Sequence, residues 1–170
     1  IFNGKASGER PVHDDSGKLL SMNELDPAAR LAAILRFSAL PGTSRHHWGT
    51  DLDVYDARAI GGDYQVQLTP SEVSPGGVFD AFHSWLDQCM EKGESEGFYR
   101  PYSEDRGGVA PERWHLSYAP LSLQCAVPDA DELLFLWRET GLLLLDEVEA
   151  QIHQLLERYV MIPEGWCPRG

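Results

Sequence analysis

The chain has 170 residues, of which 42% are hydrophobic and 24% charged, the size and composition of one globular domain. Its formal net charge of -13 argues against a nucleic-acid partner, because phosphate backbones are bound by Lys and Arg. The 3 Cys form no Cys-x-x-Cys pair, which argues against a cysteine zinc site and a redox motif and leaves the redox compartment open.

The first regular element predicted along the chain is a helix. Asp26 can cap its first amides, and Pro27 suits the first helical position, where a missing N–H has no effect. Residues 28–40 repeat apolar side chains at helical spacing. Pro41 and Gly42 then end the pattern.

Two short strands follow in the prediction. Apolar and polar residues alternate over 52–55 and over 64–68, and a glycine pair at 61–62 between them favours a hairpin. Because side chains alternate along a strand, Asp51 and Asp53 are expected to point to the same face.

The middle of the chain mixes one firm helix with further strands. Residues 69–72 have capping-box spacing and predict a short turn of helix. An apolar face at helical spacing predicts a helix over 78–92. Residues 98–102 and 114–118 predict strands, so that His115 is presented by a strand.

The last part of the chain is predicted to be helical. Residues 129–139 and 143–159 form two helical patterns, and the apolar run 142–145 is too short to span a bilayer. We therefore expect a core over residues 1–127 and a C-terminal extension over residues 128–170 packed on the same domain. The order of elements predicts an α+β fold: a small antiparallel sheet flanked by helices, with a C-terminal helical hairpin.

Two distant stretches carry the residue types that bind a metal. The segment 44–53 holds two of the 6 His together with two Asp, and residues 112–115 read Glu-Arg-Trp-His. His46, Asp53 and His115 offer the imidazoles and carboxylate that zinc takes in catalytic sites, where a fourth position stays open for water. A carboxylate three residues before His115 would supply a general base. Each short pattern also occurs by chance in polar loops and at strand edges, so the joint pattern carries the interpretation.

These stretches resemble the motifs SxHxxGxxxD and ExWH of the VanY-type D-alanyl-D-alanine carboxypeptidases, which belong to the LAS group of zinc peptidases. The likeness extends to residues 97–102 and 107–109 and covers about residues 1–120, so that the helices after Pro128 lie outside it. The residues that carry it are Ser44, His46, Gly49, Asp53, Glu112, Trp114 and His115.

The resemblance implies a role for each motif residue. Glu112 would act as general base and then as general acid. Ser44 would help to hold the substrate, and Trp114 would wall the site and position the ligand that follows it. Zinc would be bound by His46, Asp53 and His115.

The implied reaction is removal of a C-terminal D-amino acid from a peptidoglycan stem peptide, with Zn²⁺ as cofactor. An L,D-carboxypeptidase or a D,D-dipeptidase of the same group would share these motifs. A zinc-binding recognition domain without catalysis is the alternative from another class, and Glu112 argues against it because such a domain needs no base. The substrate implies the periplasm or cell envelope, with the cytoplasm as an alternative for a recycling enzyme. The oligomeric state stays open.

The chain departs from the family pattern in three places. Asp51 stands where a small residue is usual, and it would either alter metal affinity or face away and cap a loop. Arg113 replaces a frequent proline. An Arg-Ser-x-x-x-Gln segment usual before the matched region is absent, so we expect an N-terminally truncated domain; its arginine is then missing, or Arg45 or Arg100 takes its place.

Overall fold

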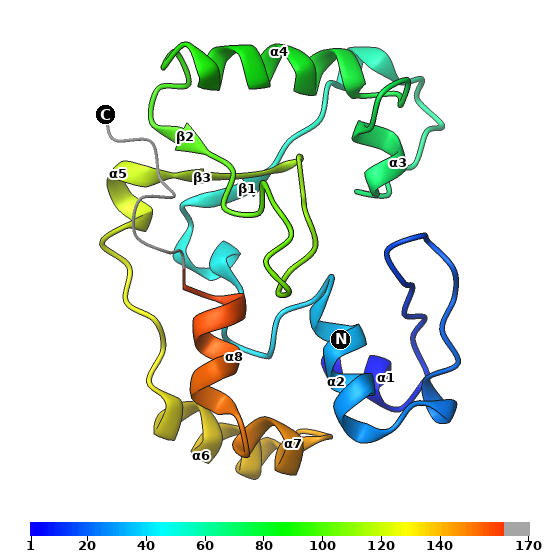
Figure 1. Ribbon diagram of the computed structural model, residues 1–170, viewed down its shortest axis with the longest axis vertical. Helices are drawn as coiled ribbons and strands as arrows, with labels where there is room; N and C mark the ends of the chain where they lie inside the picture. Colours follow the sequence, from blue (N-terminus) through cyan, green and yellow to red (C-terminus); the bar gives the residue numbers. More distant parts are fainter. Residues whose placement is uncertain (162–170) are drawn as a thin grey trace. The chain divides into compact units, whose positions relative to one another are not determined.

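The computed structural model describes residues 1–161 (Figure 1). It confirms the predicted α+β class, with one small antiparallel sheet among short helices. None of the helices in this part of the chain has the length and apolar character needed to cross a membrane. In chain order the elements are α1 (Phe2–Ala6), η1 (Met22–Glu24), α2 (Pro27–Leu35), η2 (Arg45–Trp48), β1 (Asp51–Asp53), η3 (Ala57–Ala59), α3 (Pro70–Val73), α4 (Asp80–Glu91), β2 (Phe98–Tyr99), β3 (His115–Tyr118), α5 (Ala119–Ser122), α6 (Ala130–Thr140), α7 (Leu145–Glu149) and α8 (Ile152–Tyr159).

The sheet has the strand order β1-β3-β2, and β3 is its central strand (Figure 1). Both pairings are antiparallel, and in the register of β1 with β3 Asp53 lies opposite His115 and Asp51 lies opposite Ser117. Directly opposed residues point to the same face, and alternate residues along each strand share it. The pairing therefore gathers two carboxylates, an imidazole and a hydroxyl on one face.

The predicted hairpin between 52–55 and 64–68 is wrong. The carboxylate of Glu72 accepts hydrogen bonds from the Gln67 amide at 3.0 Å, the Thr69 amide at 3.1 Å and the Tyr64 hydroxyl at 2.8 Å. Leu68 also has a positive φ of 52°, which interrupts extended backbone. A buried side chain thus takes the amides that a neighbouring strand would have bound, and β1 pairs with β3 instead.

The helices predicted over 28–40 and over 78–92 are present, and α3 corresponds to the short helical turn predicted over 69–72. Asp26 caps α2 by accepting from the Ala29 amide at 2.8 Å, and α2 ends at Leu35, earlier than predicted. Beyond that point the Arg36 carbonyl accepts from the Ala110 amide at 2.9 Å, so its backbone is bonded outside the helix. The helix α4 differs from the predicted 78–92 by no more than two residues at either end.

The C-terminal part differs from the predicted hairpin. Helix α6 is present and ends at Gly141, whose φ of 69° is the left-handed conformation favoured at a helix end. The second predicted helix is divided into α7 and α8 at Gln151, which has a non-helical φ of -141°. Pro163, Cys167 and the end of the extension 128–170 lie outside the described residues.

The described chain groups into two compact units. One contains residues 1–47, 105–110 and 126–161, and the other contains 48–104 and 111–125. The first is built on α2 and the C-terminal helices, with Trp137 fully buried and its indole N–H donating to the Pro41 carbonyl at 3.0 Å. The second contains the sheet and α4. The boundary expected at residues 127/128 stays a prediction.

The second unit has its own apolar cluster next to β3. Val73, Phe79 and Trp114 are buried together there, at 4%, 2% and 3% exposure. Trp114 directly precedes His115 in the chain, so this packing fixes the point at which β3 begins.

Candidate metal centre

The three predicted metal ligands come together in the structure. One ligand atom from each of His46, Asp53 and His115 lies within 4.8 Å of the others. His46 belongs to η2, which leads directly into β1, while Asp53 ends β1 and His115 begins β3. Asp53 and His46 are exposed and His115 is buried, so the cluster has both an anchored ligand and ligands that water can reach.

The register of the sheet explains the contact between Asp53 and His115. These residues are direct cross-strand partners, and His115 Nδ1 lies 3.5 Å from Asp53 Oδ1. Two ligand atoms bound at about 2.1 Å to one tetrahedral zinc are separated by about 3.4 Å. The pair therefore already has the spacing that a shared metal ion requires.

Glu112 lies beside the same imidazole nitrogen. Its Oε2 is 3.4 Å from His115 Nδ1, and its side chain is only 14% exposed. Two backbone hydrogen bonds hold it there, because the Glu112 amide donates to the Tyr102 carbonyl at 2.9 Å and the His115 amide donates to the Glu112 carbonyl at 3.2 Å. This tight turn places a carboxylate next to the ligand cluster, as the i, i+3 spacing in the sequence requires.

Asp51 contacts the other nitrogen of His115. Its Oδ2 lies 2.9 Å from His115 Nε2, and its Oδ1 accepts hydrogen bonds from Ser117 Oγ at 2.7 Å and Thr50 Oγ1 at 2.9 Å. Burial lowers the pKa of His115, but the hydrogen bonds with Asp51 and Glu112 outweigh it and raise that pKa to about 9 in the metal-free protein. A metal at Nδ1 would have to displace the proton held there.

Ser44 and Trp114 occupy different surroundings. Ser44 is partly exposed just before η2, where its carbonyl accepts from the His47 amide at 3.0 Å. Trp114 is buried in the apolar cluster with Val73 and Phe79. Its burial supports the expected positioning of His115, while the wall of the site and the substrate contact of Ser44 stay predictions.

Tyr102 is a residue of this centre that the sequence did not indicate. Its ring meets the His115 ring edge-on, with centroids 4.9 Å apart and an interplanar angle of 72°. The alternation of His115 and Ser117 on β3 was a signal for the polar face, but Tyr102 follows β2 in a turn that strand periodicity does not describe. Arg100, a candidate for the absent substrate-binding arginine, is buried, pairs with Asp87 and donates to the Arg113 carbonyl, so its guanidinium serves the fold.

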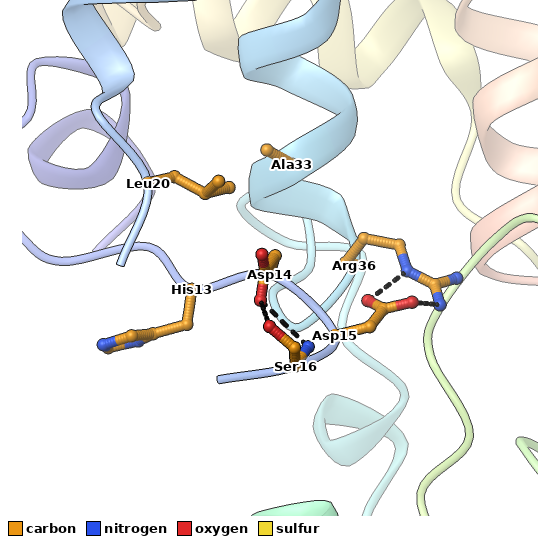
Figure 2. A pocket seen from close by; sticks show the side chains of 7 residues that line it. All are labelled: His13, Asp14, Asp15, Ser16, Leu20, Ala33 and Arg36. Atoms are coloured by element: carbon orange, nitrogen blue, oxygen red, sulfur yellow. Dashed lines mark hydrogen bonds and ion pairs between the residues drawn. The ribbon is translucent and has the colours of Figure 1, made fainter. Parts of the chain in front are cut away.

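A pocket of about 510 Å³ lies elsewhere, against α2 in the first unit (Figure 2). Arg36 donates two hydrogen bonds there to the carboxylate of Asp15, at 3.0 and 2.5 Å, and also donates to the carboxylate of Asp105. Its most prominent contacts are therefore the ion pairs of Arg36, while Asp14 accepts from the Ser16 amide and hydroxyl at 2.9 and 2.6 Å. Its lining residues are His13, Asp14, Asp15, Ser16, Leu20, Ala33 and Arg36.

An Asp and a His on one sheet face, joined by a His from the 3-10 helix before β1 and by a further carboxylate, form the donor set of a metal hydrolase. Residues 5–121 match the VanY family, described as D-alanyl-D-alanine carboxypeptidase, and the chain belongs to that family. Membership suggests a peptidase with a peptidoglycan carboxypeptidase-like function, and it covers all seven motif residues.

Two proteins of Haemophilus influenzae, both described as uncharacterized, are similar to this chain. One is 27% identical over 125 residues, which is 72% of this chain and 93% of that protein. The other is 58% identical over 40 residues, 24% of this chain and 27% of that protein. No solved structure matches.

Proposed function

We propose that the protein is a zinc-dependent carboxypeptidase that cleaves the terminal D-Ala-D-Ala bond of peptidoglycan stem peptides. The observation that carries the proposal is the convergence of Asp53 and Glu112 on Nδ1 of His115, at 3.5 and 3.4 Å, in a chain of the VanY family. The site of action follows from the substrate and is the periplasm or cell envelope.

The donor set fits zinc. His46, Asp53 and His115 would hold the ion, and three protein ligands leave a position open, as catalytic zinc sites do. When bound in such a site, zinc lowers the pKa of water to about 7 and polarises a carbonyl. The exposure of His46 and Asp53 gives a peptide access to this side of the cluster.

Glu112 is the general base in this proposal. Its carboxylate takes a proton from the attacking water, whose oxygen forms a bond to the carbonyl carbon of the scissile amide. The C–N bond then breaks, and Glu112 passes the proton to the nitrogen of the departing D-Ala. Its partly buried position and its fixed backbone allow it to serve both steps without moving.

Ser44 and Trp114 complete the proposal. Ser44 helps to hold the substrate, because it is partly exposed beside the segment that carries His46. Trp114 walls the site, and its packing against Val73 and Phe79 sets the position of His115.

The test combines metal analysis with product analysis. The purified protein is expected to contain about one zinc per chain, and it should release D-Ala from a muramyl pentapeptide. Glu112→Gln should lower kcat by about 10²–10⁴-fold while zinc stays bound. Glu91→Gln, which changes an exposed carboxylate at the end of α4, serves as the matched control and should have full activity.

The products separate the related activities. Release of D-Ala from a tetrapeptide would identify an L,D-carboxypeptidase, and hydrolysis of free D-Ala-D-Ala would identify a dipeptidase. If the protein binds zinc but hydrolyses none of these peptides, the alternative of a zinc-binding recognition domain without catalysis would be favoured. Full activity of Glu112→Gln would show that another group is the base.

A further inference from the structure

Asp51 is a charged group that the proposed reaction does not use, although it is among the most buried in the second unit. Its side chain is 0% exposed. A buried carboxylate is strongly destabilising unless hydrogen bonds compensate the lost water. Here Ser117 Oγ and Thr50 Oγ1 both donate to Oδ1, at 2.7 and 2.9 Å, and Oδ2 faces the imidazole of His115 at 2.9 Å.

The two nitrogens of His115 face different groups. Nδ1 faces Asp53 and Glu112, at 3.5 and 3.4 Å, whereas Nε2 faces Asp51. The nitrogen directed at the ligand cluster is therefore Nδ1. A neutral imidazole that binds metal through one nitrogen carries its proton on the other, and the acceptor of that proton fixes the tautomer and the ring orientation.

The surroundings of Asp51 are rigid enough for such a role. Asp51 and Ser117 are direct cross-strand partners, and Ser117 lies on the central strand, paired also with Tyr99 of β2. Ser117 is completely buried. The edge-on ring of Tyr102 then restrains the plane of the imidazole.

We propose that Asp51 is a positioning residue: it binds Nε2–H of His115 and so presents Nδ1 to the metal, with Ser117 and Thr50 holding the carboxylate in place. This inference rests on the proposed function for the presence of the metal. It excludes Asp51 as a fourth ligand at the same ion, because the imidazole ring separates its carboxylate from the ligand cluster.

The first test measures zinc affinity by competition with a chromophoric chelator, a readout that does not depend on catalysis. Asp51→Ala should weaken zinc binding by about 10–100-fold, the usual effect of losing a partner of a metal-binding histidine. Asp51→Asn should weaken it less, because the amide oxygen still accepts from Nε2–H. Asp63→Asn removes an exposed carboxylate from the same unit and should leave the affinity unchanged.

The second test reads the histidine directly. Long-range ¹H–¹⁵N spectra of the zinc-loaded protein should show His115 bound to metal through Nδ1, with the proton on Nε2. Metal at Nε2, or unchanged zinc affinity in a folded Asp51→Ala variant, would overturn the proposal; if Asp51→Ala does not fold, unchanged affinity in a folded Ser117→Ala variant would overturn it. Zinc binding without release of D-Ala would refute the proposed substrate and leave the role of Asp51 standing, whereas a wild-type protein that binds no zinc would refute both.

Discussion

The buried His83 of α4 should make the stability of the protein depend on pH below neutrality. Its side chain is fully buried, its Nε2 is without a hydrogen-bond partner among the described residues, and its Nδ1 lies 3.5 Å from a guanidinium nitrogen of Arg100. Burial, reinforced by the positive charges of Arg100 and Arg113, lowers the pKa of His83 to about 4.

The direction of the effect follows from this lowered pKa. An unfolded chain binds a proton at a histidine with a pKa of about 6.5, whereas the folded protein resists it down to about 4. The unfolded state therefore binds more protons between these values, and stability falls as the pH falls through this window. Between pH 7 and pH 5 this linkage removes about 2 kcal/mol of unfolding free energy, or about 4–8 °C in Tm for a domain of this size.

Calorimetry of the metal-free protein at pH 7, 6 and 5 measures this slope. His83→Gln, which cannot titrate, should flatten it, and His153→Gln, which changes an exposed histidine on α8, should keep it. The raised pKa of His115 acts alike in all three proteins. It adds stability as the pH falls from about 9 towards 6.5, and most of this gain is already present at pH 6.5, so the difference between the variants still reports His83. A His83→Gln variant that loses stability as steeply as wild type would refute the reasoning.

Three further predictions concern the packing of the second unit. Trp114→Ala should reduce the free energy of unfolding, measured in urea, by about 3–5 kcal/mol, because it removes the indole ring from the buried cluster with Val73 and Phe79 and leaves a cavity. Gly77→Ala would place a Cβ 2.4 Å from the Ser71 carbonyl oxygen and should lower stability by about 1–3 kcal/mol, whereas Gly62→Ala, with nothing within 4 Å, should be neutral in the same urea titration. Glu72→Ala should speed hydrogen exchange at the Gln67 amide, which now donates to this carboxylate; unchanged protection would mean that the loop is held by other contacts.

The features that could be predicted from the sequence depend on neighbouring residues. The helical spacing that predicted α4 and the cap of α2 by Asp26 are local patterns, and the structure contains both the helix and the cap. The segment 64–68 shows the opposite case. Its alternation is that of a strand, but the buried carboxylate of Glu72 binds its backbone, and nothing in the alternation reveals this.

The residues of the candidate site also fall into two groups, those that local sequence patterns indicate and those whose contacts depend on long-range packing. The spacing in the sequence indicated His46, Asp53, His115 and Glu112, and the structure brings them together. The sequence shows Asp51 only as a departure from the family pattern, because its contact with Nε2 depends on the register between two strands far apart in the chain. Local periodicity defines a strand, whereas register depends on long-range packing.

The pairing of β1 with β3 also bears on how the protein is made. It joins positions 62 to 66 residues apart, from 53 to 115 and from 51 to 117, with α4 between them. Such non-local contacts form late, since the chain must lose the entropy of closing a long loop before they stabilise it. During synthesis no ligand cluster exists until His115 has left the ribosome and β3 has found both neighbours. The proposed metal site therefore takes shape only as folding finishes, and we expect a nascent chain that has not yet paired β1 with β3 to lack the proposed activity.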